Sequence, residues 1–341
     1  MSKPFLSPRS RNSRAAFTIL ELLVSIAIFS AILVSVMSAV NQISAMWRST
    51  SDKIEAFQDA RAAFDLLTRN LSQATLNTYV GYDDDVAPKR YLRKSELQLI
   101  CKPAGTDFPG TVGTGEAVFF QAPASRTKNT TAYGGMEGLL NGCGYYIEYD
   151  PYRNDSDDPD TPDFIQAKAG HQRLHRYRLM QLLIPTEENK IYSTPTQWYE
   201  GHSLDAHVIA SNIIALIIRP QDPAATTTEV VGVDPPDLTG DYSYDSTADG
   251  NQSPQPITAN QLPPVIQVTM IAITESSAIR LGNSSTPPNT ITNALAGRFS
   301  NTAHYADDLE AVEKALSSAV PRIDYRVFSS AVPIRESRWS K

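Results

Sequence analysis

Residues 17–40 of this chain read FTILELLVSIAIFSAILVSVMSAV, an apolar run that contains one charged residue, Glu21. At about 1.5 Å per residue, a helix of this length crosses a hydrocarbon core of roughly 30 Å. The sixteen preceding residues contain no acid and four basic side chains, Lys3, Arg9, Arg11 and Arg14. The positive-inside rule therefore predicts a membrane helix with a cytoplasmic N-terminus and a translocated C-terminal part.

The residues around the start of this run distinguish it from a secretory signal peptide. The run is longer than the apolar region of a signal peptide, and its small residues, Ala15 and Ala16, precede it instead of following it. Residues 16–24, AFTILELLV, resemble the prepilin processing motif of type IV pilins and type II secretion pseudopilins. The resemblance implies that a prepilin peptidase cuts between Ala16 and Phe17 and N-methylates Phe17. The family usually has glycine at the position of Ala16, and both residues are small.

Glu21 is the residue in the apolar run that most needs an explanation. A carboxylate inside a membrane helix costs about 2.5–3.5 kcal/mol unless it is paired. The resemblance implies that Glu21 pairs with the new α-amine of Phe17 on a neighbouring subunit and sets the axial register of a filament. In a plain signal-anchored protein, the Glu21 side chain would instead reach the lipid headgroups.

The helical pattern continues beyond residue 40 while the sequence becomes more polar. Apolar residues recur there at spacings of three and four, which predicts one buried stripe on an amphipathic helix. The residues of this stripe are Phe57, Ala60, Phe64, Leu67, Leu71 and Ala74. We expect one helix over residues 17–76, and four segments: a leader at 1–16, a transmembrane helix at 17–40, an amphipathic continuation at 41–78 and a globular domain at 79–341.

The pattern of the domain is that of β-structure, with one late helix. Short alternating or apolar runs predict strands at 96–101, 117–121, 144–149, 176–184, 213–218, 265–274 and 322–328, and a helix at 306–319. These elements predict an α+β, pilin-like fold, in which one long N-terminal helix packs on antiparallel sheet.

Further segments are similar to a subfamily. Residues 64–74, FDLLTRNLSQA, resemble the second half of the stem of the type II secretion minor pseudopilin J. The order of later segments resembles the same subfamily: HRYRLMQLL at 175–183, AHVIASNIIALIIRPQ at 206–221, LPPVIQVTMIAIT at 262–274 and DYRVFSSAVPIR at 324–335. With this arrangement the chain is also similar to the pilin-like family called Verru_Chthon cassette protein C.

Residues 221–264 differ from the rest of the domain. They are rich in Pro, Thr, Ser, Asp and Gly and have almost no apolar periodicity. Such a segment buries too little apolar surface to offset the entropy of ordering it. We expect a long, exposed, disordered insertion.

The chain has two cysteines, Cys101 and Cys143. A disulfide between them is permitted if the domain lies outside the inner membrane, and in the chain-entropy model it would contribute roughly 4 kcal/mol of stability. Two buried free thiols in apolar strands are the alternative, and the sequence leaves both open.

Catalytic and metal-binding motifs are weak. His171 and His175 form HxxxH, but Gln172 stands where a zinc protease has its glutamate. The loop at 150–163, DPYRNDSDDPDTPD, offers Asp155, Asp157, Asp158 and Asp160 as calcium candidates without the EF-hand pattern. Asp83, Asp84 and Asp85 form a second acidic group. We expect solvated acidic loops, no cofactor and no enzymatic activity.

These observations predict a structural minor pilin or pseudopilin of a type II secretion or type IV pilus-like filament. Its expected partners are prepilin peptidase, other pilins in a hetero-oligomeric filament and the inner membrane, which the chain crosses once with its domain in the periplasm. The net charge of −7 and the absence of a basic stripe exclude a nucleic-acid partner. The alternatives are a pilus-displayed adhesin or ligand-binding module on the same stem, and a signal-anchored envelope enzyme.

Overall fold

The structure is a computed structural model, and it describes residues 19–84, 86–103, 115–124, 126–134, 138–151, 174–194, 198–202, 205–225, 233 and 235–340. The chain divides into two compact units, with the boundary between Ser51 and Asp52. The described residues of the first unit are helical, and the second unit contains the rest of helix α1 and all of the described strands.

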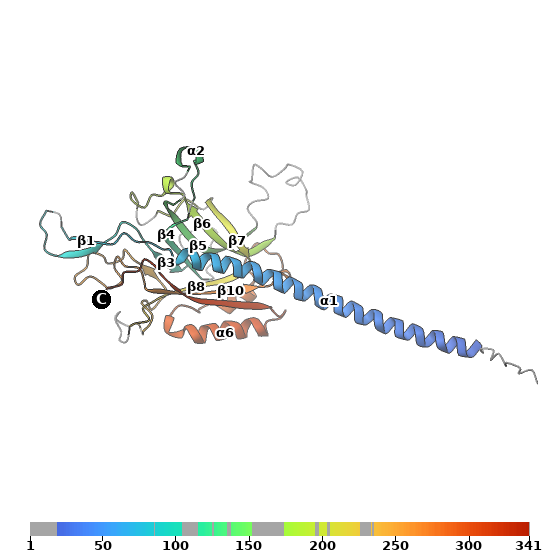
Figure 1. Cartoon of the computed structure of the whole chain (residues 1–341). Coiled ribbons are helices and arrows are strands. Elements are labelled where there is room, and N and C mark those ends of the chain that lie inside the picture. Colours follow the sequence, from blue (N-terminus) through green and yellow to red (C-terminus); the bar gives the residue numbers. More distant parts are fainter. Residues whose placement is uncertain are drawn as a thin grey trace, which may run out of the picture. The chain divides into compact units, whose positions relative to one another are not determined.

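The helices are α1 (Ile19–Leu71), α2 (Thr130–Tyr133), α4 (Glu275–Leu281), α5 (Asn289–Leu295) and α6 (Tyr305–Ser318), with short 3-10 turns η2 (Thr186–Glu188) and η4 (Thr302–His304). The strands are β1 (Tyr79–Tyr82), β2 (Tyr91–Lys94), β3 (Ile100–Pro103), β4 (Glu116–Pro123), β5 (Leu140–Pro151), β6 (His175–Ile184), β7 (Ala206–Ser211), β8 (Ile213–Gln221), β9 (Tyr244–Asp245), β10 (Val265–Ile273) and β11 (Tyr325–Pro333). The fold is α+β, with a long N-terminal apolar helix and antiparallel sheets (Figure 1).

Helix α1 confirms the expected stripe. Ala60, Phe64, Leu67, Leu71 and Ala74 are buried, and Phe57 packs against them. The helix ends at Leu71, five residues before the expected end at residue 76. The chain leaves the helix there because the backbone N–H of Thr75 donates to Gln121 O of β4 at 2.9 Å and not to a helical carbonyl.

The larger sheet has the strand order β7-β6-β5-β4-β3-β9 and buries both faces. One face joins the main core, to which Val118, Phe120 and Tyr145 belong. The other face carries Phe119, Tyr146 and Leu182, and Trp198 and Tyr199 cover it. Phe119 stacks on Tyr199 with ring centroids 4.4 Å apart.

The smaller sheet has the order β11-β10-β8 and lies between α1 and α6 (Figure 1). Phe64 of α1 contacts Phe328 of β11, with ring centroids 5.9 Å apart. Thr269 of β10 lies on the opposite face, where its Oγ1 is 2.7 Å from the hydroxyl of Tyr305 in α6. Coverage on both faces explains why β8 and β10 are almost continuously apolar.

The expectation of a disordered, exposed insertion at 221–264 is wrong for residues 235–264. Leu238, Tyr242, Tyr244, Ala259 and Leu262 are buried, and Tyr244 belongs to β9, which pairs with Cys101 of β3. The buried hydroxyl of Tyr244 donates to Gln261 O at 2.7 Å. A few large side chains therefore fix this Pro-rich segment to the domain without any periodic pattern. Residues 226–232 and 234 lie outside the described residues.

Glu116 is a buried carboxyl at the junction of the two sheets. Gly115 forms a parallel bridge with Leu216, and a Cβ on Gly115 would lie 2.4 Å from Leu216 O. Because β4 and β8 approach so closely here, the carboxyl of Glu116 in β4 accepts the backbone N–H of Ile218 in β8. Burial raises the pKa of this carboxyl well above its ordinary value, against the opposing effects of that hydrogen bond and of Arg219.

We expect Glu116→Gln to stabilise the domain at neutral pH. The folded chain keeps the Glu116 proton at pH values where the unfolded chain, with its ordinary pKa of 4.5, has released it, so stability falls as pH rises above 4.5. The amide stays neutral and keeps an acceptor for Ile218. The variant should match the wild type near pH 4 and gain about 1.4 kcal/mol per pH unit above 4.5, until the folded pKa is passed.

Urea unfolding of the full chain, followed by tryptophan fluorescence, to which the buried Trp198 contributes, would measure this difference. The exposed Glu310→Gln is the matched control. Parallel pH profiles for wild type and Glu116→Gln would show that Glu116 does not hold a proton in the folded state.

Candidate functional site

The most exposed apolar surface of the described chain lies on residues 19–44. Ile19–Ser44 is a 26-residue stretch of α1 that is long and apolar enough to cross a membrane, and none of it is buried. Leu20 and Phe29 expose 72% and 65% of their surface. Burying one large apolar side chain contributes about 1.5–3 kcal/mol, so a helix that is apolar all round requires lipid or other helices around it.

Glu21 lies in the first turn of α1 as the structure describes it. It is exposed on the same helical segment as Leu20 and Leu22, and its backbone carbonyl accepts the hydroxyl of Ser25 at 2.7 Å. A carboxylate near a helix N-terminus interacts favourably with the helix dipole. The processing residues Ala16 and Phe17 lie outside the described residues, so the structure does not test the cut between them.

Residues 11–37 match a family model described as the prokaryotic N-terminal methylation motif. The match includes Ala16, Phe17 and Glu21, and it runs into the exposed apolar part of α1. It supports a type IV prepilin-like protein that is anchored in a membrane. Comparison of the chain with curated proteins and with solved structures gave no match.

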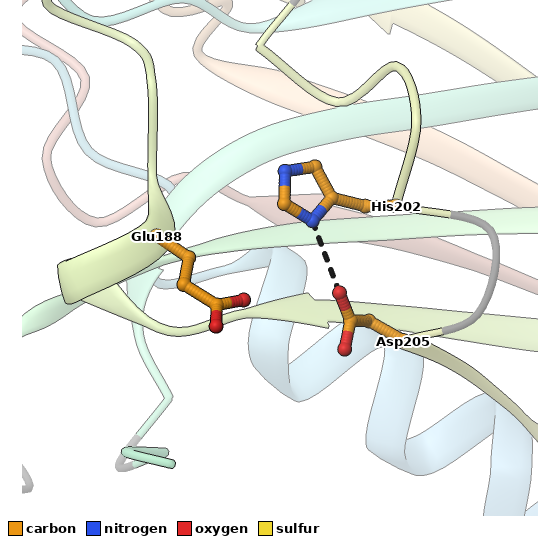
Figure 2. A group of neighbouring side chains, drawn as sticks. All are labelled: Glu188, His202 and Asp205. Carbon is orange, nitrogen blue, oxygen red and sulfur yellow. Dashed lines mark hydrogen bonds and ion pairs between the residues drawn. The ribbon is translucent and has the colours of Figure 1, made fainter. Parts of the chain in front are cut away.

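A second cluster of functional-type side chains lies in the domain. Glu188 of η2, His202 and Asp205 place one potential ligand atom each within 4.8 Å of one another (Figure 2). His202 Nδ1 is 3.0 Å from Asp205 Oδ2. The ligand types would suit a divalent cation such as zinc. No sequence motif indicates this cluster, because its members are separated along the chain.

Lys128 already places a positive charge between the two carboxylates. Its Nζ is 2.7 Å from Glu188 Oε2 and 2.9 Å from Asp205 Oδ1. Hydrogen bonds to these two carboxylates raise the pKa of Lys128. Burial raises the pKa of Asp205, but the bonds from Lys128 and His202 outweigh it, and the net shift is downward. The arrangement is therefore an ion-pair network that holds the loop before α2 on η2.

The structure describes only some of the acidic and histidine residues that the sequence offers as metal-binding or catalytic candidates. Asp155, Asp157, Asp158, Asp160, Asp85 and His171 lie outside the described residues. Asp83 accepts the backbone N–H of Lys89 at 2.9 Å, which is the main cause of its lowered pKa. Asp84 accepts the N–H of Val86 at 2.7 Å. Both carboxylates therefore order the β1–β2 turn.

Both cysteines are free and buried. Cys101 of β3 pairs with Val118, Cys143 of β5 pairs with Phe120, and β4 lies between them. Two strand spacings amount to about 9.5 Å, beyond the separation of Cα atoms that a disulfide allows. Burial raises the pKa of Cys143 to about 12 and that of Cys101 well above its usual value, so both are unreactive thiols.

We expect Lys128→Met to lower the free energy of unfolding by about 1 kcal/mol or less, as for other partly exposed ion pairs, because Glu188 and Asp205 then repel each other. High salt should reduce the difference. The exposed Lys314→Met changes net charge equally and should have little effect. Millimolar calcium or zinc should leave the wild-type unfolding midpoint unchanged. A metal-induced rise in the midpoint that Asp205→Asn abolishes would establish a metal site instead.

Proposed function

We propose that this protein is a structural minor pilin or pseudopilin subunit of a type II secretion or type IV pilus-like filament. The observation that carries the proposal is the methylation-motif match at residues 11–37, which continues into a helix with no buried residue from Ile19 to Ser44. Such a helix can remain in lipid or pack among similar helices without any change in its own fold. The domain from Asp52 onward is large for a repeating lattice, which favours a position at a filament end.

The proposal includes the topology and the partners. The basic leader places the N-terminus in the cytoplasm, prepilin peptidase processes it, and the domain lies in the periplasm. Other pilins contact the apolar helix, and Glu21 sets their register. The arrangement of the later segments makes a J-type pseudopilin, or the Verru_Chthon cassette protein C family, the preferred subfamily. No catalytic step and no cofactor belong to this role.

The adhesin alternative loses part of its basis in the structure. It assigned a contact surface to the Pro-rich insertion and to the tyrosines of the chain. Tyr242 and Tyr244, within that insertion, are buried in the domain core. A structural subunit remains the better proposal because it uses the exposed apolar helix, none of which is buried from Ile19 to Ser44.

Processing is tested by intact-mass and N-terminal analysis of protein extracted from membranes of cells with an active prepilin peptidase. We expect a chain that begins at N-methylated Phe17. Ala16→Gly should be cut at least as completely, whereas the bulky Ala16→Leu should remain full length because a small residue is required beside the cut. If the wild-type chain still begins at Met1 or Ser2, the processing proposal is wrong and the apolar run is only a membrane anchor.

Assembly is tested with Glu21→Gln, which removes the charge and keeps the shape. Membrane insertion should be retained or improved, since a neutral amide costs less to place in a membrane helix than a carboxylate does. The fraction of protein recovered with sheared filaments should fall severalfold. Ser25→Ala, one helical turn away, is the matched control. Equal recovery of Glu21→Gln and wild type would refute the registering role.

A further inference from the structure

The β1–β2 hairpin exposes an apolar surface that no described part of the domain covers. Its strands are paired in register from Tyr79 opposite Lys94 to Tyr82 opposite Tyr91. Val80 and Tyr91 expose 67% and 69% of their surface, and the rings of Tyr82 and Tyr91 lie 5.1 Å apart. Exposed tyrosines on a strand pair are typical of contact surfaces.

Two arginines of the hairpin bind backbone carbonyls outside it and hold it in place. Arg90 Nη2 donates to Asn251 O at 2.6 Å, and its Nε is 3.2 Å from Asp83 Oδ2. Arg93 Nη2 donates to Pro256 O at 2.6 Å. A partner would therefore meet a preformed surface and would lose little affinity to ordering it.

The hydrogen-bond phase of the hairpin shows which backbone groups point outward. The N–H of Asp83 donates to Arg90 O at 3.1 Å. Hydrogen-bonded residues alternate along an antiparallel strand, so Gly81 and Tyr79 are the next residues of β1 that bond to β2. The N–H and C=O groups of Val80 and Tyr82 consequently point away from β2. Within the described part of the chain, none of these four groups has a hydrogen-bond partner.

The opposite edge of the hairpin is partly closed. The N–H of Arg93 on β2 donates to Gln255 Oε1 at 3.0 Å, and its carbonyl accepts Gln255 Nε2 and Asn260 Nδ2, each at 2.8 Å. Among the described residues, none caps the β1 edge in this way, and its sequence YVGY contains no lysine or proline to discourage pairing. The open edge of the hairpin is therefore β1.

We propose that β1 pairs edge to edge with β1 of a second copy of this chain. In an antiparallel pair centred on Gly81, Val80 of each copy exchanges backbone hydrogen bonds with Tyr82 of the other. Gly81 then faces Gly81 in a non-hydrogen-bonded position, where Cα atoms approach to about 4.5 Å. The absence of a side chain at Gly81 permits that approach, and the two hairpins become one four-stranded sheet.

The side chains of this edge are complementary to themselves. Val80 and Tyr82 lie on one face of the hairpin. In the two-fold pair, Val80 of each copy lies opposite Tyr82 of the other, and such a pair of a β-branched and an aromatic residue is favourable across strands. Tyr91 extends the same surface. Asp83 stands opposite Tyr79 in this register, so no like charges face each other. Two-fold symmetry is also the commonest arrangement of soluble oligomers.

This contact is additional to the proposed function, because it uses the domain and not the apolar helix. Cysteine cross-linking of the full-length chain in membranes tests it. Oxidised Gly81→Cys should form a covalent dimer, since a Cβ at Gly81 would meet only the side chains of Lys94 and Tyr79, at 3.1 Å or more. Native Cys101 and Cys143 are buried and give little background. Val86→Cys, in the same hairpin and 93% exposed, lies outside the pairing register and should give little dimer.

A second substitution separates edge pairing from chance collision. Val80→Pro removes an outward N–H but no bond to β2, and proline is tolerated on an edge strand. Combined with Gly81→Cys, it should lower the dimer yield about tenfold, from the lost hydrogen bonds. Val80→Thr should retain the yield. The proposal is overturned if Gly81→Cys gives no more dimer than Val86→Cys, if Val80→Pro has no effect, or if Gly81→Cys links only to a different protein. Because none of these variants alters residues 11–44, failure here leaves the filament proposal intact.

Discussion

One helix has to satisfy two environments, and the architecture of the domain follows from its second half. From Ala60 to Leu71 the apolar surface of α1 narrows to a stripe, which enters the main core. Hydrogen bonds orient the helix on the sheet. The hydroxyl of Tyr145 in β5 accepts hydrogen bonds from Asn70 Nδ2 of α1 and Gln181 Nε2 of β6, each at 2.7 Å. Because residues of both sheets share the core with this stripe, neither sheet could be packed in its present position without the helix.

The sequence predicted those elements whose pattern is local. The late helix and the strands β4, β6, β8 and β10 were predicted close to their observed bounds, and β5 over its middle part, because alternation or continuous apolar runs report burial directly. Residues 235–264 were misjudged for the opposite reason. Tyr242, Tyr244 and Leu262 are isolated among polar residues, and their burial follows from distant partners, such as Cys101 opposite Tyr244. Periodicity carries no information on such contacts.

The same distinction applies to the functional residues. Ala16, Phe17 and Glu21 could be proposed from the sequence because the processing motif is contiguous, and their roles stay predictions. Lys128, Glu188 and Asp205 are far apart in the sequence and are brought together by the fold, so no sequence spacing predicts their contact. The alternatives for Cys101 and Cys143 could be separated only by strand order, since β4 lies between their strands. Glu116 gave no signal, because a carboxyl at a strand start is usually exposed.

The exposed helix and the exposed strand edge need different kinds of partner, because one presents apolar side chains and the other presents polar backbone groups. Apolar side chains on residues 19–44 gain the same free energy from lipid tails as from other helices, since the hydrophobic effect has no direction. The outward N–H and C=O groups of Val80 and Tyr82 are directional, and only water, a polar side chain or another strand can satisfy them. A membrane can therefore cover the first surface completely while leaving the second open. Covering the apolar helix therefore does nothing for the polar backbone groups of β1, which need hydrogen-bond partners of their own.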